Sequence, residues 1–328
     1  MFKVLIITFT GIAIGYLLRQ LKTLQHLQKT ISWTIYLLLF FFGLQVGANE
    51  QVVGNLDTLG LKALLIAVAG SFGSCVAAWG LYKWVFKGGN HLPDNKDHTG
   101  QNDLSGRNDR CASKLKRFLQ YAAGFITAGF FAVGCVCGVS GVVPQHLCGG
   151  AVSMYVLYAL MVQVGMSIGC DRRLKEMLTS LSPKLFLLPL GTILGTLAAV
   201  AAVSIVVNGI NFTECMAVGA GFGYYSLSSV LITQIKEPLV GGALAAQIGT
   251  IALMANIIRE IITLLFAPAI GKLFGRLAPI SVGGATSMDS TLPVITVACG
   301  KEMAFVSIFH GVLVDFSVPF LVTFFASM

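Results

Sequence analysis

A polar cluster interrupts the long apolar stretch between residues 240 and 270. The cluster contains Asn256, Arg259 and Glu260, and the stretch around it is long enough to cross a lipid bilayer as one helix. At about 1.5 Å of rise per helical residue, Glu260 would lie roughly in the middle of the membrane. An ionisable side chain at that depth costs at least about 2 to 3 kcal/mol, so it normally faces a polar cavity or a partner. We therefore expect Glu260 to bind a solute or a proton.

Helical periodicity adds Asn256 to the same predicted site. Asn256 and Glu260 are four residues apart and therefore share one face of a helix, whereas Arg259 lies beside that face. All three are candidates for binding a substrate or a coupling ion. The alternative is that Arg259 and Glu260 neutralise each other and only hold helices together.

A glycine-rich segment supplies a second set of candidates. Residues 219–229 read Gly-Ala-Gly-Phe-Gly-Tyr-Tyr-Ser-Leu-Ser-Ser. Glycine at every second position lets the backbone bend and leaves its carbonyl and amide groups available to a ligand. The hydroxyl groups of Tyr225, Ser226 and Ser228 would add to them. The alternative is a kinked packing helix; a nucleotide loop fits poorly, because no strand and no lysine stand where a phosphate loop needs them.

The segment 283–293 has the composition of a broken helix. It reads Gly-Gly-Ala-Thr-Ser-Met-Asp-Ser-Thr-Leu-Pro, with one acid among four hydroxyl residues. Asp289 could receive a cation, Thr286 and Ser287 could hydrogen-bond to it, and the freed backbone amides could hold a carboxylate. The alternative is a helix N-cap on the solvent side of the membrane.

Three further polar residues carry weaker signals. His310 lies in an apolar background, where it could shuttle protons or be a buried hydrogen-bonded histidine. Asp315 is five residues further on, so it does not share the face of His310, and its role stays open. Glu50 falls at the outer end of the second apolar segment, a place where acids are more often interfacial than functional.

The composition is that of an integral membrane protein without catalytic machinery. Apolar residues make up 55% of the chain and charged residues only 11%, about half of what a soluble domain carries. The net charge of +8 comes from basic residues between apolar segments, which is typical of cytoplasmic loops and not of nucleic-acid binding. No enzyme motif, metal-ligand spacing or cofactor motif is found, so we expect a non-enzyme that has neither metal nor cofactor.

The fold class predicted is an all-α polytopic membrane protein with ten apolar segments. These segments cover residues 4–18, 31–49, 61–86, 118–141, 149–169, 184–208, 213–235, 240–270, 283–299 and 304–327. The segments 213–235 and 283–299 are expected to be re-entrant or broken, which leaves eight transmembrane helices; ten full spans are the alternative. The loops 19–30, 83–117 and 170–184 hold fifteen of the twenty-two Lys and Arg, which predicts that both termini lie outside the cytoplasm.

Four parts follow from this segmentation. Residues 1–86 hold helices one to three, 87–117 form a polar cytoplasmic loop, 118–208 hold helices four to six, and 209–328 form a transport core with the two broken elements. The first and third parts share a weak repeat of glycines four apart. Three spans in each unit would invert one copy relative to the other, an architecture found in secondary transporters. Coincidence of two common helix-packing motifs is the alternative.

The order and wording of these motifs carry a family resemblance over nearly the whole chain. The motifs are Gly-Phe-Gly-Tyr-Tyr-Ser-Leu-Ser from Gly221, Arg259-Glu260, Gly-Gly-Ala-Thr-Ser-Met-Asp from Gly283, Thr291-Leu292-Pro293 and His310-Gly311. Together they resemble the bacterial lysine exporter family of the LysO type. The resemblance implies a multi-pass carrier of the bacterial inner membrane that exports L-lysine and its analogues through intramembrane acids, with Glu260 on a matching motif and Glu50 on a looser one.

The resulting hypothesis is a secondary transporter that exports L-lysine in exchange for protons or another cation. Glu260 and Asp289 would supply the anionic cavity that a cationic amino acid needs. A monovalent cation/proton antiporter is the first alternative, because the same acids could bind sodium. A non-transporting membrane scaffold is the second. The oligomeric state and the coupling stoichiometry are not indicated by the sequence.

Overall fold

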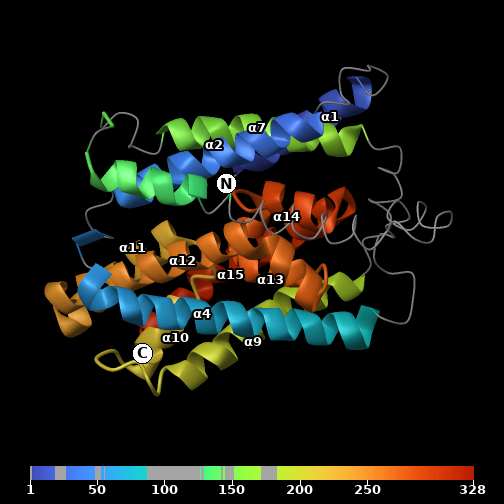
Figure 1. Cartoon of the computed structure of the whole chain (residues 1–328). Helices are drawn as coiled ribbons and strands as arrows, with labels where there is room; N and C mark the ends of the chain where they lie inside the picture. Colours follow the sequence, from blue (N-terminus) through green and yellow to red (C-terminus); the bar gives the residue numbers. More distant parts are fainter. Residues whose placement is uncertain are drawn as a thin grey trace, which may run out of the picture.

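The computed structural model describes an all-helical chain (Figure 1). The described residues are 2–18, 27–48, 56–86, 129–141, 151–170 and 183–328, with the single positions 53, 54, 126, 143 and 144. Within those ranges the structure has α- and 3₁₀-helices, one π-helical turn and no strand. This agrees with the predicted all-α class.

One body of the molecule is formed by α1 (Phe2–Leu18), α2 (Leu27–Gly47), α7 (Ala151–Gly169) and the short helix Gly129–Val139. The labelled helices of this body lie together along the top of Figure 1. Glycines let their backbones touch: a Cβ at Gly15 of α1 would lie only 2.3 Å from the carbonyl oxygen of Met166 in α7. The same contact recurs between α2 and the short helix, where a Cβ at Gly47 would lie 2.2 Å from the oxygen of Cys135.

These two contacts use the same glycine spacing. In the first contact Gly11 and Gly15 face Gly165 and Gly169, and in the second Gly43 and Gly47 face Gly134 and Gly138. The glycines facing α2 are thus Gly134 and Gly138, whereas a Cβ added at Gly129 would have nothing within 4 Å.

The second body contains the longer helices and the two broken elements. The helices α4 (Leu56–Leu81) and α9 (Leu187–Val203) pack along its edge, and α12 (Gly242–Phe274) and α15 (Ala304–Ala326) run through its interior. A π-helical turn (Tyr82–Phe86) extends α4, and a 3₁₀ turn (Pro183–Phe186) precedes α9. The apolar cores of this body include Ile248, Ile251 and Val318, all of which are buried.

The first broken element doubles back on itself. It consists of α10 (Phe212–Gly219) and α11 (Tyr225–Val240), and we call it hairpin 1. Glu214 at the start of α10 pairs with Lys236 near the end of α11 at 3.8 Å, so the two ends of the element lie side by side. The turn between the helices is strained at Phe222, whose φ of 44° is unusual for a residue other than glycine.

The second broken element has the same construction. It consists of α13 (Ala278–Gly283), the 3₁₀ turn Gly284–Met288 and α14 (Leu292–Cys299), and we call it hairpin 2. Arg276, just before α13, donates to the carbonyl oxygen of Cys299 at 2.8 Å and forms an ion pair with Glu302 of the following 3₁₀ turn, Lys301–Met303. The base of this hairpin is therefore also closed.

The tips of the two hairpins meet inside the second body. The backbone N–H of Ala285 donates to the carbonyl oxygen of Phe222 at 2.9 Å. Gly284 is required at this crossing, because it has a φ of 59° and because a Cβ there would lie 2.3 Å from the Phe222 oxygen. Two unwound stretches of backbone are thus placed next to each other.

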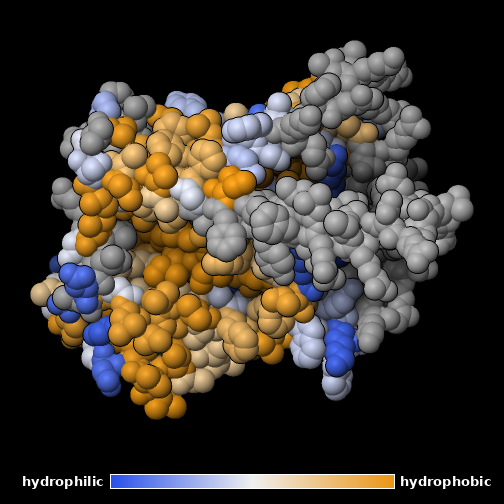
Figure 2. Space-filling model, viewed as in Figure 1, coloured by the Kyte–Doolittle hydropathy of each residue, from blue (hydrophilic) through white to orange (hydrophobic). Residues whose placement is uncertain are grey.

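Six helices of the described chain are long and apolar enough to cross a membrane. They contain the windows Thr30–Gly47, Leu59–Val85, Val152–Gly169, Lys184–Val203, Gly242–Phe274 and Lys301–Ala326, and the shorter apolar helices Ile6–Leu18 and Gly129–Val139 accompany them. An eight-residue helix such as α10 or α14 is about 12 Å long, far short of the roughly 30 Å hydrocarbon core. Figure 2 shows apolar side chains over both bodies, with hydrophilic ones mainly toward the two ends.

Candidate functional site

A cavity of about 680 Å³ lies between the two bodies, beside the hairpin tips. This volume is in the range of roughly 300 to 1,000 Å³ that is usual for small-molecule sites. Its wall from the first body consists of α2 and α7 residues, namely Leu38, Phe42, Gln45, Ser153, Met154, Tyr155, Leu157 and Tyr158. Its wall from the second body consists of Gly223, Tyr224, Tyr225, Ser226, Glu260, Leu264, Ala285, Thr286, Asp289, Ser290 and Asp315.

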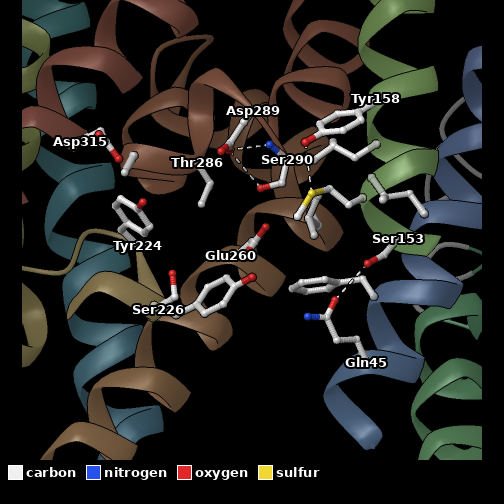
Figure 3. Close-up of a pocket in the computed structure, with 18 of the residues that line it drawn as sticks. Gln45, Ser153, Tyr158, Tyr224, Ser226, Glu260, Thr286, Asp289, Ser290 and Asp315 are labelled. Atoms are coloured by element: carbon white, nitrogen blue, oxygen red, sulfur yellow. Dashed lines mark hydrogen bonds between the residues drawn. The ribbon is translucent and has the colours of Figure 1, made fainter. Parts of the chain in front are cut away.

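Three carboxylates from three separate elements face this cavity (Figure 3). Glu260 comes from the middle of α12, Asp289 from the tip of hairpin 2, and Asp315 from α15. Asp289 is close enough to interact electrostatically with each of the other two. No lysine, arginine or histidine is among the described residues that line the cavity, so its electrostatic character is strongly anionic.

Glu260 is the most enclosed of the three acids. Its side chain is 2% exposed, and its Oε2 atom has no hydrogen-bond partner within the described structure. The side chain of Ser290 interacts with the carboxyl group of Glu260. A buried polar atom without a partner is costly and normally marks a site that a ligand, an ion or water completes.

Asp289 is held by the backbone of its own turn. Its Oδ1 accepts a hydrogen bond from the N–H of Ser290 at 2.6 Å and one from the Ser290 hydroxyl at 3.3 Å. The neighbouring Thr286 also lines the cavity, and its hydroxyl donates to the carbonyl oxygen of Gly283. The unwinding after Gly284 is what turns these side chains out of a helix and toward the cavity.

Hairpin 1 contributes hydroxyl groups and a helix N-terminus. Tyr225 and Ser226 line the cavity and are the first two residues of α11. The first N–H groups of a helix have no partner within it and carry a partial positive charge. Across the cavity, the hydroxyl of Ser153 donates to the side-chain oxygen of Gln45 at 3.1 Å and links α7 to α2.

Asn256 and Ser228 hold the tip of hairpin 1 and do not line the cavity. The side-chain oxygen of Asn256 accepts from the N–H of Gly223 at 2.8 Å, and its amide nitrogen donates to the Ser228 hydroxyl at 3.3 Å and to two backbone oxygens. Ser228 in turn donates to the carbonyl oxygen of Tyr224. Both residues therefore hold the tip of hairpin 1 in place without reaching the cavity.

Arg259 points away from the cavity and holds hairpin 2. Its Nε donates to the carbonyl oxygen of Val282 at 2.9 Å, and its Nη2 donates to Ser281 and Thr196, each at 3.2 Å. Its guanidinium lies 5.7 Å from the ring centre of Phe222, at the tip of hairpin 1. No ion pair with Glu260 is found among the described residues, so the alternative of an Arg–Glu pair is not seen there, and Arg259 binds carbonyl oxygens instead.

His310 and Ser287 belong to a buried hydrogen-bonded chain behind hairpin 2. The His310 ring lies 2.8 Å from the Thr192 hydroxyl through Nε2 and 3.0 Å from the Ser287 hydroxyl through Nδ1. Thr192 also contacts the Ser281 hydroxyl. His310 and Ser287 do not line the cavity, and this geometry favours the buried hydrogen-bonded histidine over a residue exposed to substrate.

The sequence-predicted site residues thus divide into two groups. Glu260, Asp289, Tyr225, Ser226 and Thr286 line the cavity, whereas Arg259, Asn256, Ser228, Ser287 and His310 support it from behind. Glu50 lies outside the described residues.

Asp315 also lines the cavity, although the sequence analysis left its role open. The sequence feature that could have indicated this is the five-residue spacing between His310 and Asp315, which places their side chains on different faces of α15. Gln45 and Tyr158 were also not among the candidates, because nothing in an apolar helix marks which face meets a cavity.

Comparison with known proteins gives one consistent description. The model of the family described as Lysine exporter LysO matches residues 5–88 and 128–326. The Lysine exporter LysO of Escherichia coli (strain K12) is 28% identical over 333 residues, covering 100% of both chains. A putative lysine exporter of Haemophilus influenzae (strain ATCC 51907 / DSM 11121 / KW20 / Rd) is 35% identical over 115 residues, which are 35% of this chain and 54% of that protein. No solved structure matches the chain.

Proposed function

Since the chain belongs to the lysine exporter LysO family, we propose that it is a secondary transporter that carries L-lysine out of the cytoplasm. It is a multi-pass protein of the bacterial inner membrane. The observation that carries the proposal is the cavity between the two bodies, which presents Glu260, Asp289 and Asp315 and no cationic side chain among its described residues. A cargo with two ammonium groups matches this charge.

The cavity offers complementary groups for each end of lysine. The side-chain ammonium would pair with Glu260, whose Oε2 atom has no partner among the described residues. The α-ammonium would pair with Asp289, and the hydroxyl of Thr286 stands beside it. The α-carboxylate would face Ser226 and the positively polarised N-terminus of α11. Arg259 is not part of this pose, because its guanidinium binds backbone carbonyls.

Export of a cation needs a driving ion. A negative-inside potential holds lysine in the cell by about 2.3 kcal/mol per charge for each 100 mV. An acid that binds either a proton or an ammonium group couples the two flows, since release of one permits binding of the other. Glu260 fits this role because it is buried in the interior of α12 and yet faces the cavity. We assign the coupling ion as a proton.

The membrane topology consistent with this function has eight spans and two re-entrant hairpins, with both termini outside. The ion pair between Glu214 and Lys236 supports a hairpin that enters and leaves on one side. Lys236 is also buried within α11, so it does not count as a loop charge in assigning the orientation of the spans. Hairpin 1 then enters from outside and hairpin 2 from the cytoplasm.

The proposed division of the chain follows the glycine contacts. Residues 1–86 and 118–208 would be inverted copies of three helices, joined by the loop 87–117, and 209–328 would be the transport core. The contacts of Gly11 with α7 and of Gly43 with the short helix Gly129–Val139 support this division. If residues 1–86 and 118–208 are inverted copies, interchanging the two copies converts the first of these contacts into the second, as inverted repeats require.

Lysine release from cells that lack other lysine exporters tests the function. Cells expressing the native chain, the Glu260→Gln variant or an empty vector are loaded with a lysine-containing dipeptide, and external lysine is followed at matched membrane abundance. We expect release only with the native chain. Release by the Glu260→Gln variant at the native rate would remove Glu260 from the mechanism.

Two other results would point elsewhere. Absence of lysine release, together with sodium-dependent proton movement in vesicles, would identify a cation/proton antiporter that uses the same acids. Variants of the three acids that differ from the native protein only in abundance would identify a membrane scaffold.

A further inference from the structure

The third acid of the cavity, Asp315, has no part in the lysine pose. Its side chain is 7% exposed and lines the cavity from α15, and Figure 3 shows it beside Tyr224. Within the described structure its carboxylate has neither a hydrogen bond nor an ion pair, although Asp289 is in electrostatic range. A nearly buried carboxylate that no described residue pairs with is a favourable place for a cation, because burying an unpaired charge is strongly unfavourable.

The cavity has more groups that can pair with a cation than groups that can pair with an anion. Three carboxylates face it, whereas a substrate carboxylate would meet hydroxyl and amide groups and one helix end, with no cationic side chain among the described lining residues. The nearest guanidinium, that of Arg259, is directed at the carbonyl oxygens of Val282 and Ser281. Removal of the carboxylate from a substrate therefore gives up no ion pair with a described lining residue and raises the net positive charge of the substrate.

The remaining wall suits a chain of methylene groups. Leu38 and Phe42 of α2 and Leu264 of α12 are apolar residues of the same lining. They would cover the middle of a linear molecule whose two charged ends reach separate carboxylates. The volume of about 680 Å³ leaves ample room for such a molecule.

We propose that Asp315 forms a second cation subsite opposite Glu260, and that the cavity carries linear α,ω-diamines as well as lysine. The simplest such molecule is 1,5-diaminopentane, which has the carbon chain and both amino groups of lysine and no carboxylate. The proposal rests on the proposed transport function and extends its substrate class. It requires two ammonium groups at the ends of one chain.

Exchange in reconstituted vesicles tests the substrate class. Vesicles containing the full-length protein and loaded with unlabelled lysine are given labelled lysine or labelled 1,5-diaminopentane outside, with protein-free vesicles as the correction for passive diffusion. We expect both labels to accumulate by exchange. Pentylamine and 6-aminohexanoate, which each lack one amino group, should inhibit lysine exchange at least about tenfold more weakly than the diamine, because each loses one charge-assisted contact.

Variants at position 315 test the residue. Asp315→Asn should weaken the apparent affinity for 1,5-diaminopentane at least about tenfold and leave the weak inhibition by pentylamine unchanged, since pentylamine needs one subsite only. Asp315→Glu should retain diamine exchange because it keeps the charge. Asp57→Asn, which removes an exposed acid in the first turn of α4, is the matched control and should behave as the native protein. A purely structural role of Asp315 would not separate the diamine from the monoamine.

The outcomes are distinguishable from one another. Lysine exchange without diamine exchange or inhibition would overturn the inference and leave lysine transport standing. Absence of lysine exchange by the native protein would overturn the proposed function itself. Diamine exchange by Asp315→Asn at native affinity would overturn the assignment of the second subsite to Asp315.

Discussion

Arg259 and Glu260 are adjacent in the sequence and have different surroundings in the structure. The carboxylate of Glu260 faces the cavity, whereas the guanidinium of Arg259 binds backbone carbonyls of hairpin 2. Helix geometry explains the difference, because consecutive side chains are turned by about 100°. Substitutions of Arg259 should therefore lower the stability of the protein, whereas substitutions of Glu260 should impair lysine transport.

We expect Arg259→Met to lower stability. The change leaves the buried carbonyl oxygens of Val282 and Ser281 without their donor, and each unsatisfied group costs about 1 to 3 kcal/mol. Thermal unfolding of the protein in detergent and its abundance in membranes measure the effect. Asp289→Asn is the comparison: it should unfold near the native temperature and lose lysine transport.

Arg259→Lys separates this role from substrate binding. Lysine keeps the charge but cannot donate to two carbonyls from one planar fork, so stability should still fall. Transport per folded molecule should change little, because Arg259 does not line the cavity. A folded Arg259→Lys protein with a selective loss of lysine affinity would return Arg259 to the binding site.

Residue spacing predicted only part of the candidate site. It placed Glu260 at mid-membrane depth, and Glu260, Asp289 and Ser226 do face one cavity. It could not assign Arg259 or His310, because their partners at Val282 and Thr192 are far away in the chain and are brought near by tertiary packing. Asp315 was left open for the same reason, since nothing in α15 alone shows which face meets the cavity.

At the scale of elements, each hairpin is closed at its base and anchored at its tip. Glu214–Lys236 closes hairpin 1, Arg276–Glu302 closes hairpin 2, and the Ala285–Phe222 backbone hydrogen bond joins the tips. The sequence predicted both breaks from their Gly, Ser and Thr content. It left open whether each segment turns back, because that depends on ion pairs between residues more than twenty positions apart.

Lys236→Met tests the closure of hairpin 1. Both side chains of the pair are almost fully buried, at 5% and 3% exposure, so removing the lysine leaves Glu214 unpaired. The expected loss of stability is about 3 to 5 kcal/mol. The double variant Lys236→Met/Glu214→Gln should recover part of that loss, as measured by thermal unfolding in detergent. Equal stability of the native and Lys236→Met proteins would mean that the pair does not hold the hairpin.

Gly284→Ala tests the junction of the tips. The new methyl group would lie 2.3 Å from the carbonyl oxygen of Phe222, and φ at this position is 59°. The backbone must therefore move, which separates the tips and should abolish lysine transport. Gly80→Ala in α4 is the control, since a Cβ there has nothing within 4 Å and should leave transport intact. Normal transport by Gly284→Ala would show that the tip junction is dispensable.

At the scale of the whole molecule, the cavity lies between two bodies with different construction. The first body is a set of closely packed helices joined by glycine contacts, and the second contains both hairpins and all three acids. The cavity extends from the hairpin tips to Gln45 and Ser153, near the end of α2 and the start of α7. In the proposed topology these are the outer ends of the two helices, so the cavity would lie nearer the outer surface of the membrane.

The proposed topology predicts which loops can be labelled from outside the cell. If hairpin 1 is re-entrant, single cysteines at Asn208 and Gly241 should both react with a membrane-impermeant thiol reagent added to intact cells. If hairpin 2 is re-entrant, cysteines at Gly275 and Gly300 should both be protected until the cells are opened. Ten full spans would instead place Asn208 and Gly241 on opposite sides, and likewise Gly275 and Gly300.

This experiment starts from a variant in which all eight native cysteines are replaced. That cysteine-free variant must still export lysine. Gly241 and Gly275 have φ values of 86° and 92°, so a cysteine at either position is strained. Nearby positions are less suitable, because Leu239 belongs to α11 and Arg276 forms an ion pair with Glu302. Export by each single-cysteine variant must therefore be measured before its labelling is interpreted. Labelling of both members of one pair from the same side, in variants that still export lysine, is expected only of a hairpin, because a helix that crosses the membrane separates its two ends by the full hydrocarbon core.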